Sequence, residues 1–158
     1  MKQPEHKTYF SPLALKSFVA AEGKEIKSVI CYLWHNAINK NEIVELIDNI
    51  EFAFNDNSRL NVSNNADNTG LDVIDFNFEG EKKEIEIEYG GKIKLFAVNA
   101  SPTKMWEDVI GKKLIAVQLT KENDNYLCDS ILLNFGEERR IVSASPLDGL
   151  VIDFYEED

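Results

Sequence analysis

The chain contains two segments whose sequence blocks recur in the same order, and this constrains its fold more than any other feature. Ser11-Pro12 and Ser101-Pro102 each begin a segment that reaches a Gly-Lys pair, at Gly23 and Gly111. Further matches follow: 46–50 with 127–131, Phe54 with Phe135, Arg59-Leu60 with Arg140-Ile141, and 70–76 with 149–154. The shared order predicts a tandem duplication.

This duplication predicts one domain over residues 1–158, in which two copies of one module pack with approximate two-fold symmetry. The repeats span about 11–79 and 101–157. A length of 158 residues suits a single domain of this kind.

Each repeat begins with the signals of a short helix. A serine suits the N-cap, a proline suits the first helical position, and Gly23 or Gly111 suits the end of the helix. Alternating apolar residues then predict four strands in each repeat. We place them near 24–34, 43–54, 59–64 and 71–78, and near 112–120, 126–135, 139–144 and 149–155. The predicted fold class is mainly β (α+β), an antiparallel sandwich or partly open barrel.

Residues between the repeats predict an extra hairpin at about 81–98. Its turn is Tyr89-Gly90-Gly91, and a three-residue loop sets Glu88 opposite Lys92 and Ile87 opposite Ile93. Opposite charges then meet on one face and apolar residues on the other.

Composition excludes several classes of protein. The 17 Lys+Arg against 28 Asp+Glu give a net charge of −11, which argues against nucleic-acid binding. No run approaches the roughly 18 apolar residues of a membrane span, and the N-terminus lacks a signal peptide. Two cysteines do not form a disulfide framework, so we expect a reduced, cytoplasmic protein.

The acidic residues are concentrated in residues 42–81, where ten acidic side chains accompany one basic side chain, Arg59. Such a field attracts basic partners, although an acidic surface also keeps a small protein soluble. Tyr32 and Trp34 have no aromatic counterparts in the second repeat. They are either packing residues or interface anchors. The candidate partner-binding residues are Glu42, Glu45, Glu51, Tyr32 and Trp34.

Asp48 and Asp129 occupy aligned positions, and each interrupts an apolar alternation. One interpretation is a pair of carboxylates near the two-fold axis, in a small-molecule-binding or hydrolytic site. The other is a β-bulge or bend in which each aspartate accepts backbone hydrogen bonds. Asp75 and Asp153 are also aligned, and alternation places them on a solvated face.

The motifs of common enzymes are missing. There is no Walker loop, dinucleotide-binding loop or serine-hydrolase elbow. Cys31 and His35 supply two ligands where a structural zinc needs about four, and a reactive cysteine needs electropositive surroundings. We predict no catalytic residues, no cofactor and no metal, and favour a protein that is not an enzyme.

The blocks at 106–114, 131–135 and 149–152 resemble small uncharacterised bacterial β-rich proteins, some of which are similar to immunity proteins that neutralise polymorphic toxins. The resemblance implies no catalytic residues. It favours a non-enzymatic acidic protein that holds a basic protein partner. The alternatives are the small-molecule or hydrolytic site near Asp48 and Asp129, and a structural or oligomerising module with an apolar patch at Trp34.

Overall fold

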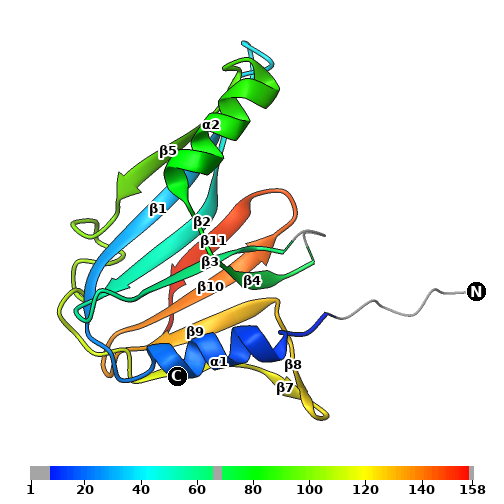
Figure 1. The fold of residues 1–158 in the computed structure, drawn as a ribbon. Helices are drawn as coiled ribbons and strands as arrows, with labels where there is room; N and C mark the ends of the chain where they lie inside the picture. The colour runs from blue at the N-terminus through cyan, green and yellow to red at the C-terminus, as the bar shows by residue number, and fades with distance from the viewer. Residues whose placement is uncertain (1–7, 66–68, 157–158) are drawn as a thin grey trace, which may run out of the picture.

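The computed structural model describes residues 8–65 and 69–156 of the chain. Within them, nine strands form one sheet that curls into a half-barrel, and two short strands form a separate hairpin (Figure 1). The helices of the described residues are α1 (Pro12–Ala21) and α2 (Phe78–Tyr89). The predicted class, mainly β with a partly open barrel, is confirmed.

The strands have the following bounds: β1 Ile26–Asn36, β2 Val44–Phe54, β3 Arg59–Asn64, β4 Leu71–Ile74, β5 Ile93–Asn99, β6 Ala116–Gln118, β7 Lys121–Glu122, β8 Asn125–Tyr126, β9 Ser130–Asn134, β10 Arg139–Ser145 and β11 Gly149–Phe154. Strands β1 to β4 form one antiparallel meander, and β6, β9, β10 and β11 form another. A parallel bridge between Ile47 of β2 and Gly149 of β11 joins the two meanders.

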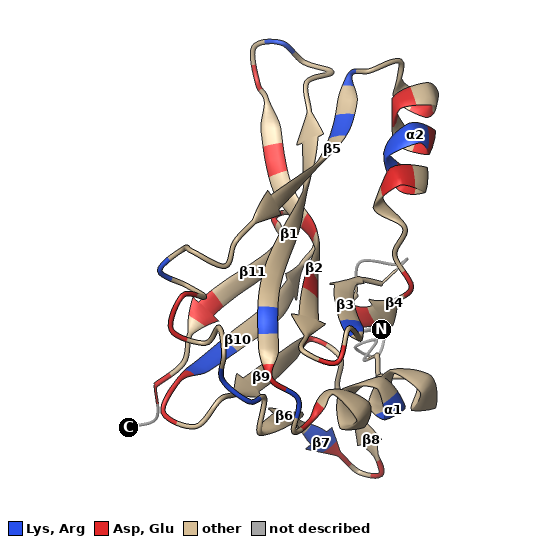
Figure 2. Cartoon of the chain, turned by 60° about the vertical axis from the view of Figure 1, so that its left-hand side comes forward, with Lys and Arg blue, Asp and Glu red and all other residues tan. Residues whose placement is uncertain are grey.

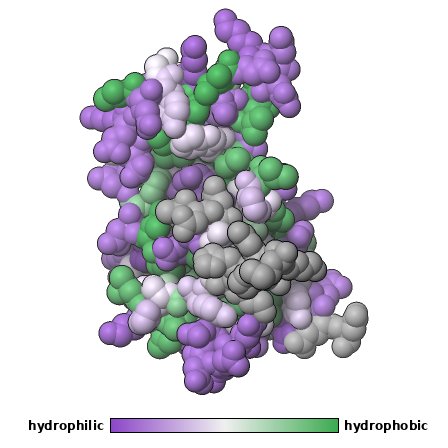
Figure 3. Space-filling view, turned by 90° about the vertical axis from the view of Figure 1, so that its right-hand side faces the viewer, coloured by the Kyte–Doolittle hydropathy of each residue, from purple (hydrophilic) through white to green (hydrophobic). Residues whose placement is uncertain are grey.

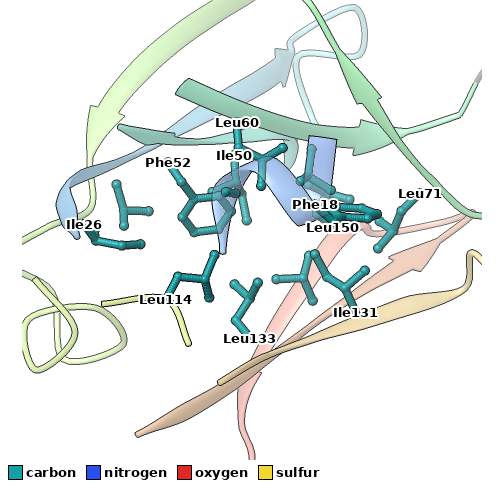
Figure 4. Packing of buried hydrophobic residues seen from close by; sticks show 14 of the residues in the cluster. Phe18, Ile26, Ile50, Phe52, Leu60, Leu71, Leu114, Ile131, Leu133 and Leu150 are labelled. Carbon is teal, nitrogen blue, oxygen red and sulfur yellow. The ribbon is translucent and has the colours of Figure 1, made fainter. Parts of the chain in front are cut away.

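The main core lies between the two meanders. In Figure 4, Ile50, Phe52 and Leu60 of the first meander point toward Ile131 and Leu133 of the second. All five of these side chains are buried. The alternation that predicted these strands therefore reflects one shared apolar interior.

Helix α1 forms where the sequence predicts it. The Ser11 hydroxyl oxygen accepts a hydrogen bond from the Ala14 amide at 3.2 Å, and Pro12 is the first helical residue. The helix packs Phe18 into the main core, where its ring meets Phe10 edge-on at 5.0 Å. Gly23 follows the helix with a φ of +86°.

The helix predicted before Gly111 does not form. Residues 101–111 make successive turns, in which the amides of Trp106 and Val109 donate to carbonyls three residues earlier. These turns bury Trp106 and Val109, which are three residues apart, on the same side of the chain. Trp106 meets Phe52 edge-on at 5.5 Å. The apolar residues therefore reach the core without an α-helix.

The hairpin predicted at 81–98 is also wrong, because its first half is helix α2. The Asn77 side chain accepts a hydrogen bond from the Gly80 amide at 3.3 Å, and Gly90 ends the helix in the left-handed conformation. The second half is β5, which pairs with β1. Alternation of Ile85 and Ile87 suggested a strand, but only Ile85 is buried.

A second, smaller core lies between α2 and the outer face of β1 and β5. Tyr32, Ile85, Ile93 and Leu95 are buried in it, and Trp34 packs against them. Helix α2 therefore covers one end of the sheet, on the face opposite the main core (Figure 1).

Candidate functional site

The structure separates the predicted partner-binding residues. Glu42 and Glu45 are exposed near the connection between β1 and β2, where a Glu45 carboxylate oxygen lies 2.9 Å from Nδ1 of His35. Tyr32 and Glu51 are buried. Trp34 is half-buried. These residues do not form one exposed surface.

Glu51 belongs to a buried polar network on the outer face of β1, β2 and β3. Its side chain accepts a hydrogen bond from Nδ2 of Asn61 at 3.5 Å and lies 3.7 Å from the Arg59 guanidinium. Burial, the negative charge of Glu51 and a hydrogen bond to that carboxylate raise the pKa of Tyr32 to about 12. The Tyr32 hydroxyl and the Glu51 carboxylate therefore form a hydrogen bond inside the protein. Neither side chain lies on an exposed surface that a partner contacts.

Asp48 is the extra residue of a β-bulge. Tyr32 pairs with Asn49 and Leu33 pairs with Ile47, so no residue of β1 lies opposite Asp48. The bulge lets Ile47 and Ile50 both pack on the main core. The Asp48 carboxylate accepts a hydrogen bond from Nδ2 of Asn49 at 3.0 Å.

Asp129, which the sequence aligns with Asp48, lies at a bend immediately before β9 and outside any strand. Cys128 and Ile131 are buried on either side of it, whereas Asp129 is exposed. Its backbone carbonyl accepts a hydrogen bond from Ala144 at 3.0 Å. Of the four cavities whose lining residues are described, one is lined by Asp48 and none by Asp129. These four cavities therefore do not bring the two carboxylates together.

One cavity, the Asp48 cavity, lies where the two meanders join and has a volume of about 380 Å³. Its lining residues come from β1, β2, the end of β3 and the connection to β11: Trp34, Leu46, Asp48, Asn64, Asn65, Pro146 and Gly149. It brings together two residues that the sequence indicated for different reasons, Trp34 and Asp48.

A second feature is the α1–β4 groove, formed by two adjoining cavities of about 230 and 270 Å³. Both are lined by Ser17 of α1 and by Val73, Ile74 and Asp75 at the end of β4. The remaining lining residues are Ser11, Leu13, Ala14, Ala20, Ala21, Lys24, Phe54, Ser58, Arg59, Leu60, Asn61 and Asp72.

Strand β4 is an edge strand, since β3 is its one strand partner in the sheet of the described residues. On its free side, the Leu71 amide donates to the Cys128 carbonyl at 2.6 Å. The Val73 amide donates to the side chain of Asp72 at 2.8 Å. Backbone groups of alternate residues on this strand therefore point away from β3.

The groove is acidic along β4. Asp72 and Asp75 line it, and Glu79 and Glu81 follow in the first turn of α2 (Figure 2). The basic residues lie at the other end, and both have acidic partners there. Lys24 lies 3.1 Å from Asp56, and Arg59 lies near Glu51.

Sequence reasoning placed Asp75 on a solvated face, and it is exposed. It did not identify the groove, because the two walls come from segments about sixty residues apart. The acidic content of residues 42–81 was the one signal that pointed to this region.

Among the described residues, no group of three or more His, Cys, Asp or Glu side chains is placed to hold a metal. No helix in residues 8–65 and 69–156 has the length and apolar character needed to cross a membrane. No family model, no curated protein and no solved structure matches this chain.

Proposed function

We propose that this protein is a non-enzymatic binding protein that holds an extended, basic segment of a protein partner in the α1–β4 groove. The observation that carries the proposal is the outer edge of β4, which pairs with no second strand of the described residues and lines the groove with Asp72 and Asp75. In the terms of the resemblance to immunity proteins, the partner is a basic toxin.

Main-chain hydrogen bonds supply the first part of the recognition. An extended segment that pairs with β4 donates to its outward carbonyls and replaces the local hydrogen bond between the Val73 amide and the Asp72 side chain, while the Leu71 amide keeps its bond to Cys128. Such pairing adds a strand to the sheet and gives affinity that does not depend on side chains. Helix α1 forms the opposite wall. Leu13, with 75% of its surface exposed, and Val73 and Ile74 offer apolar contacts to alternate side chains of the bound segment.

Charge supplies the second part of the recognition of the partner segment. Asp72 and Asp75 favour lysine or arginine in the bound segment, and the acidic first turn of α2 extends the same field. Charge complementarity of this kind raises the association rate and selects against acidic partners.

Figure 3 shows a face of the molecule on which hydrophobic side chains are scattered among hydrophilic ones, and hydrophilic side chains gather at the α2 end. Among the described residues visible on that face, the hydrophobic side chains do not gather into the broad apolar patch that an oligomerising module requires.

The test uses two fluorescently labelled ten-residue peptides, one alternating lysine with valine and one alternating glutamate with valine. Fluorescence anisotropy measures their affinity for the full chain at low and high salt. We expect the lysine peptide to bind and to weaken with salt, because exposed charge contacts are screened. Asp72→Asn with Asp75→Asn should weaken binding about threefold to tenfold.

The control variant is Asp153→Asn, which changes the residue aligned with Asp75 on the exposed side of β11. It should leave the affinity unchanged. Two further peptides, N-methylated at odd or at even positions, test strand addition, and one of them should lose binding. Loss of affinity in Glu42→Gln with Glu45→Gln, but not in the groove variant, would place the site near the β1–β2 connection instead.

A further inference from the structure

We infer that the Asp48 cavity binds a small organic cation, an amine or guanidinium compound. This site is separate from the α1–β4 groove, and the inference does not depend on the proposed function. It rests on how the cavity is built and on the chemistry of its walls.

The walls of the cavity are held by the main chain and by packing. The β-bulge at Asp48 turns this carboxylate away from the main core, onto the same face of the sheet as Trp34. Trp34 lies opposite Leu46, and its ring meets Tyr89 of α2 edge-on at 5.9 Å. The indole is therefore fixed by contacts from both the sheet and the helix.

The second meander closes the cavity through Gly149. A side chain at this position would place its Cβ atom 2.6 Å from the Ile47 carbonyl oxygen, and its φ is +73°. Only glycine allows the β10–β11 connection to approach β2 this closely. The cavity is thus a product of the junction between the two meanders.

The polar groups of the cavity favour a donor of hydrogen bonds. Asp48 is the single charged residue among the lining residues, and no lysine, arginine or histidine of the described chain lines the cavity with it. Among residues 8–65 and 69–156, its carboxylate accepts one side-chain hydrogen bond, from Asn49, and a carboxylate offers further acceptor positions.

Asn64 lines the same cavity. Its side-chain oxygen is buried and has no hydrogen-bond partner among the described residues. Leaving such an atom without a partner is costly, and a small rotation of the carboxamide toward a bound N–H group relieves that cost. The neighbouring Asn65 side chain is held by hydrogen bonds to Thr69 and forms a fixed wall.

A tryptophan and a carboxylate that line the same cavity are suited to a cation. The indole of tryptophan is the best of the aromatic side chains for cation–π attraction, and the carboxylate supplies the ionic hydrogen bond. A volume of about 380 Å³ lies within the range of small-molecule sites. An anion would meet only the negative charge of Asp48.

Two kinds of ligand carry such a cationic group: a free amine or guanidinium compound, and an arginine or lysine side chain of another protein. Agmatine represents the free cation, and N-acetyl-arginine amide represents a guanidinium carried by a peptide chain. Glucose, at matched concentration, represents a neutral ligand that stacks on tryptophan.

The experiment is an NMR titration of the full chain, with the indole N–H resonance of Trp34 as the reporter. We expect a saturable shift with agmatine and none with glucose. Asp48→Asn should weaken binding about tenfold, because it removes the charge and keeps the shape of the side chain. Saturation by N-acetyl-arginine amide with higher affinity than agmatine would identify the protein-borne source.

The matched control is Asp129→Asn, which changes the aligned residue that does not line the cavity. It should leave the affinity for agmatine unchanged, as should Asp72→Asn with Asp75→Asn in the groove. The amide spectrum of each variant verifies its fold. Equal shifts with glucose and agmatine, no saturable shift in the millimolar range, or an unaltered affinity in a folded Asp48→Asn variant would each overturn the inference.

Discussion

Glu25 and Lys113 lie opposite each other in an antiparallel bridge, each two residues after a glycine that the sequence aligns. The hydrogen bonds around this bridge are reciprocal. The Gly23 amide donates to the Leu114 carbonyl at 2.7 Å, and the Gly111 amide donates to the Ile26 carbonyl at 2.8 Å.

The inner pair of hydrogen bonds has the same symmetry. The Leu114 amide donates to the Lys24 carbonyl at 2.8 Å, and the Ile26 amide donates to the Lys112 carbonyl at 2.9 Å. Exchange of the two segments reproduces all four bonds. A tandem duplication accounts for this arrangement, and the duplication itself remains a prediction.

The first prediction concerns the two glycines beside the bridge. Gly23 and Gly111 both have a φ of +86°, and a Cβ atom at either would meet nothing within 4 Å. Gly23→Ala and Gly111→Ala should therefore lower the free energy of unfolding by similar amounts, about 1 kcal/mol each, from backbone strain alone. Urea denaturation measures both.

The control for these variants is Gly80→Ala, in the first turn of α2. Gly80 has no positive φ, and a Cβ atom there would make an ordinary contact with Asn77 at 3.5 Å. Alanine should stabilise the protein by about 0.5–1 kcal/mol, because it favours the helix. Strongly unequal losses at Gly23 and Gly111 would contradict the reciprocal geometry.

The second prediction concerns Gly70, which closes the sheet against the second meander. A Cβ atom at Gly70 would collide with the Cys128 sulfur and lie 2.7 Å from the Cys128 carbonyl oxygen. Gly70→Ala should therefore lower the free energy of unfolding by about 1–3 kcal/mol. Adding Cys128→Ala should not restore stability, because the clash with the backbone oxygen remains. Full rescue by the second substitution would show that the sulfur alone sets the limit.

The third prediction separates helix α2 from the hairpin that the alternation of residues suggested. Ile85 is 9% exposed and packs with Tyr32, Ile93 and Leu95, whereas Ile87 is 83% exposed. Ile85→Ala should cost about 2–4 kcal/mol, and Ile87→Ala should change stability by less than about 0.5 kcal/mol. Thermal or urea denaturation measures the difference. Similar losses at the two positions would favour the hairpin, in which both side chains share a face.

The fourth prediction concerns the pH dependence of stability. Hydrogen bonds from the Ser58 side chain and backbone, together with Lys24, lower the pKa of Asp56 to about 2. Because the folded-state pKa is lower than the ordinary value of 3.8, these contacts stabilise the protein above that value. Their contribution is lost as the pH falls from about 4 toward 2.

Urea denaturation of the wild-type protein and Asp56→Asn at several pH values tests this prediction. The wild-type protein should be the more stable at neutral pH, and the difference should vanish near pH 2. Asp153→Asn is the control, because Asp153 is an exposed carboxylate on β11, away from Ser58 and Lys24. A difference that stays constant down to pH 2 would assign the effect of Asp56 to something other than its charge.

Local signals in the sequence were sufficient for the elements that depend on neighbouring residues. The N-cap Ser11 and the following Pro12 specify α1 because they satisfy its first turn directly. Alternation specified β2, since its apolar side chains face one interior. The cap signals of α2, Asn77 and Gly90, were also present in the sequence. They were outweighed by the alternation of Ile85 and Ile87.

Aligned residues nevertheless differ in environment. Arg140 is 1% exposed and stacks over Phe154, with Nε donating to the Met105 carbonyl at 2.6 Å. The side chain of its counterpart, Arg59, is 65% exposed. A sequence alignment equates the two arginines, and only the packing of each meander distinguishes them.

The sequence by itself determined the mainly β class, the position of α1, most of the strands and the aligned positions of the two segments. These follow from periodicity and from caps, which act over a few residues. Tertiary structure decided that Glu51 is buried, that a bulge carries Asp48, and that α1 and β4 form a groove. Those features depend on which distant segments meet in the closed sheet, and a linear pattern of residues does not contain that information.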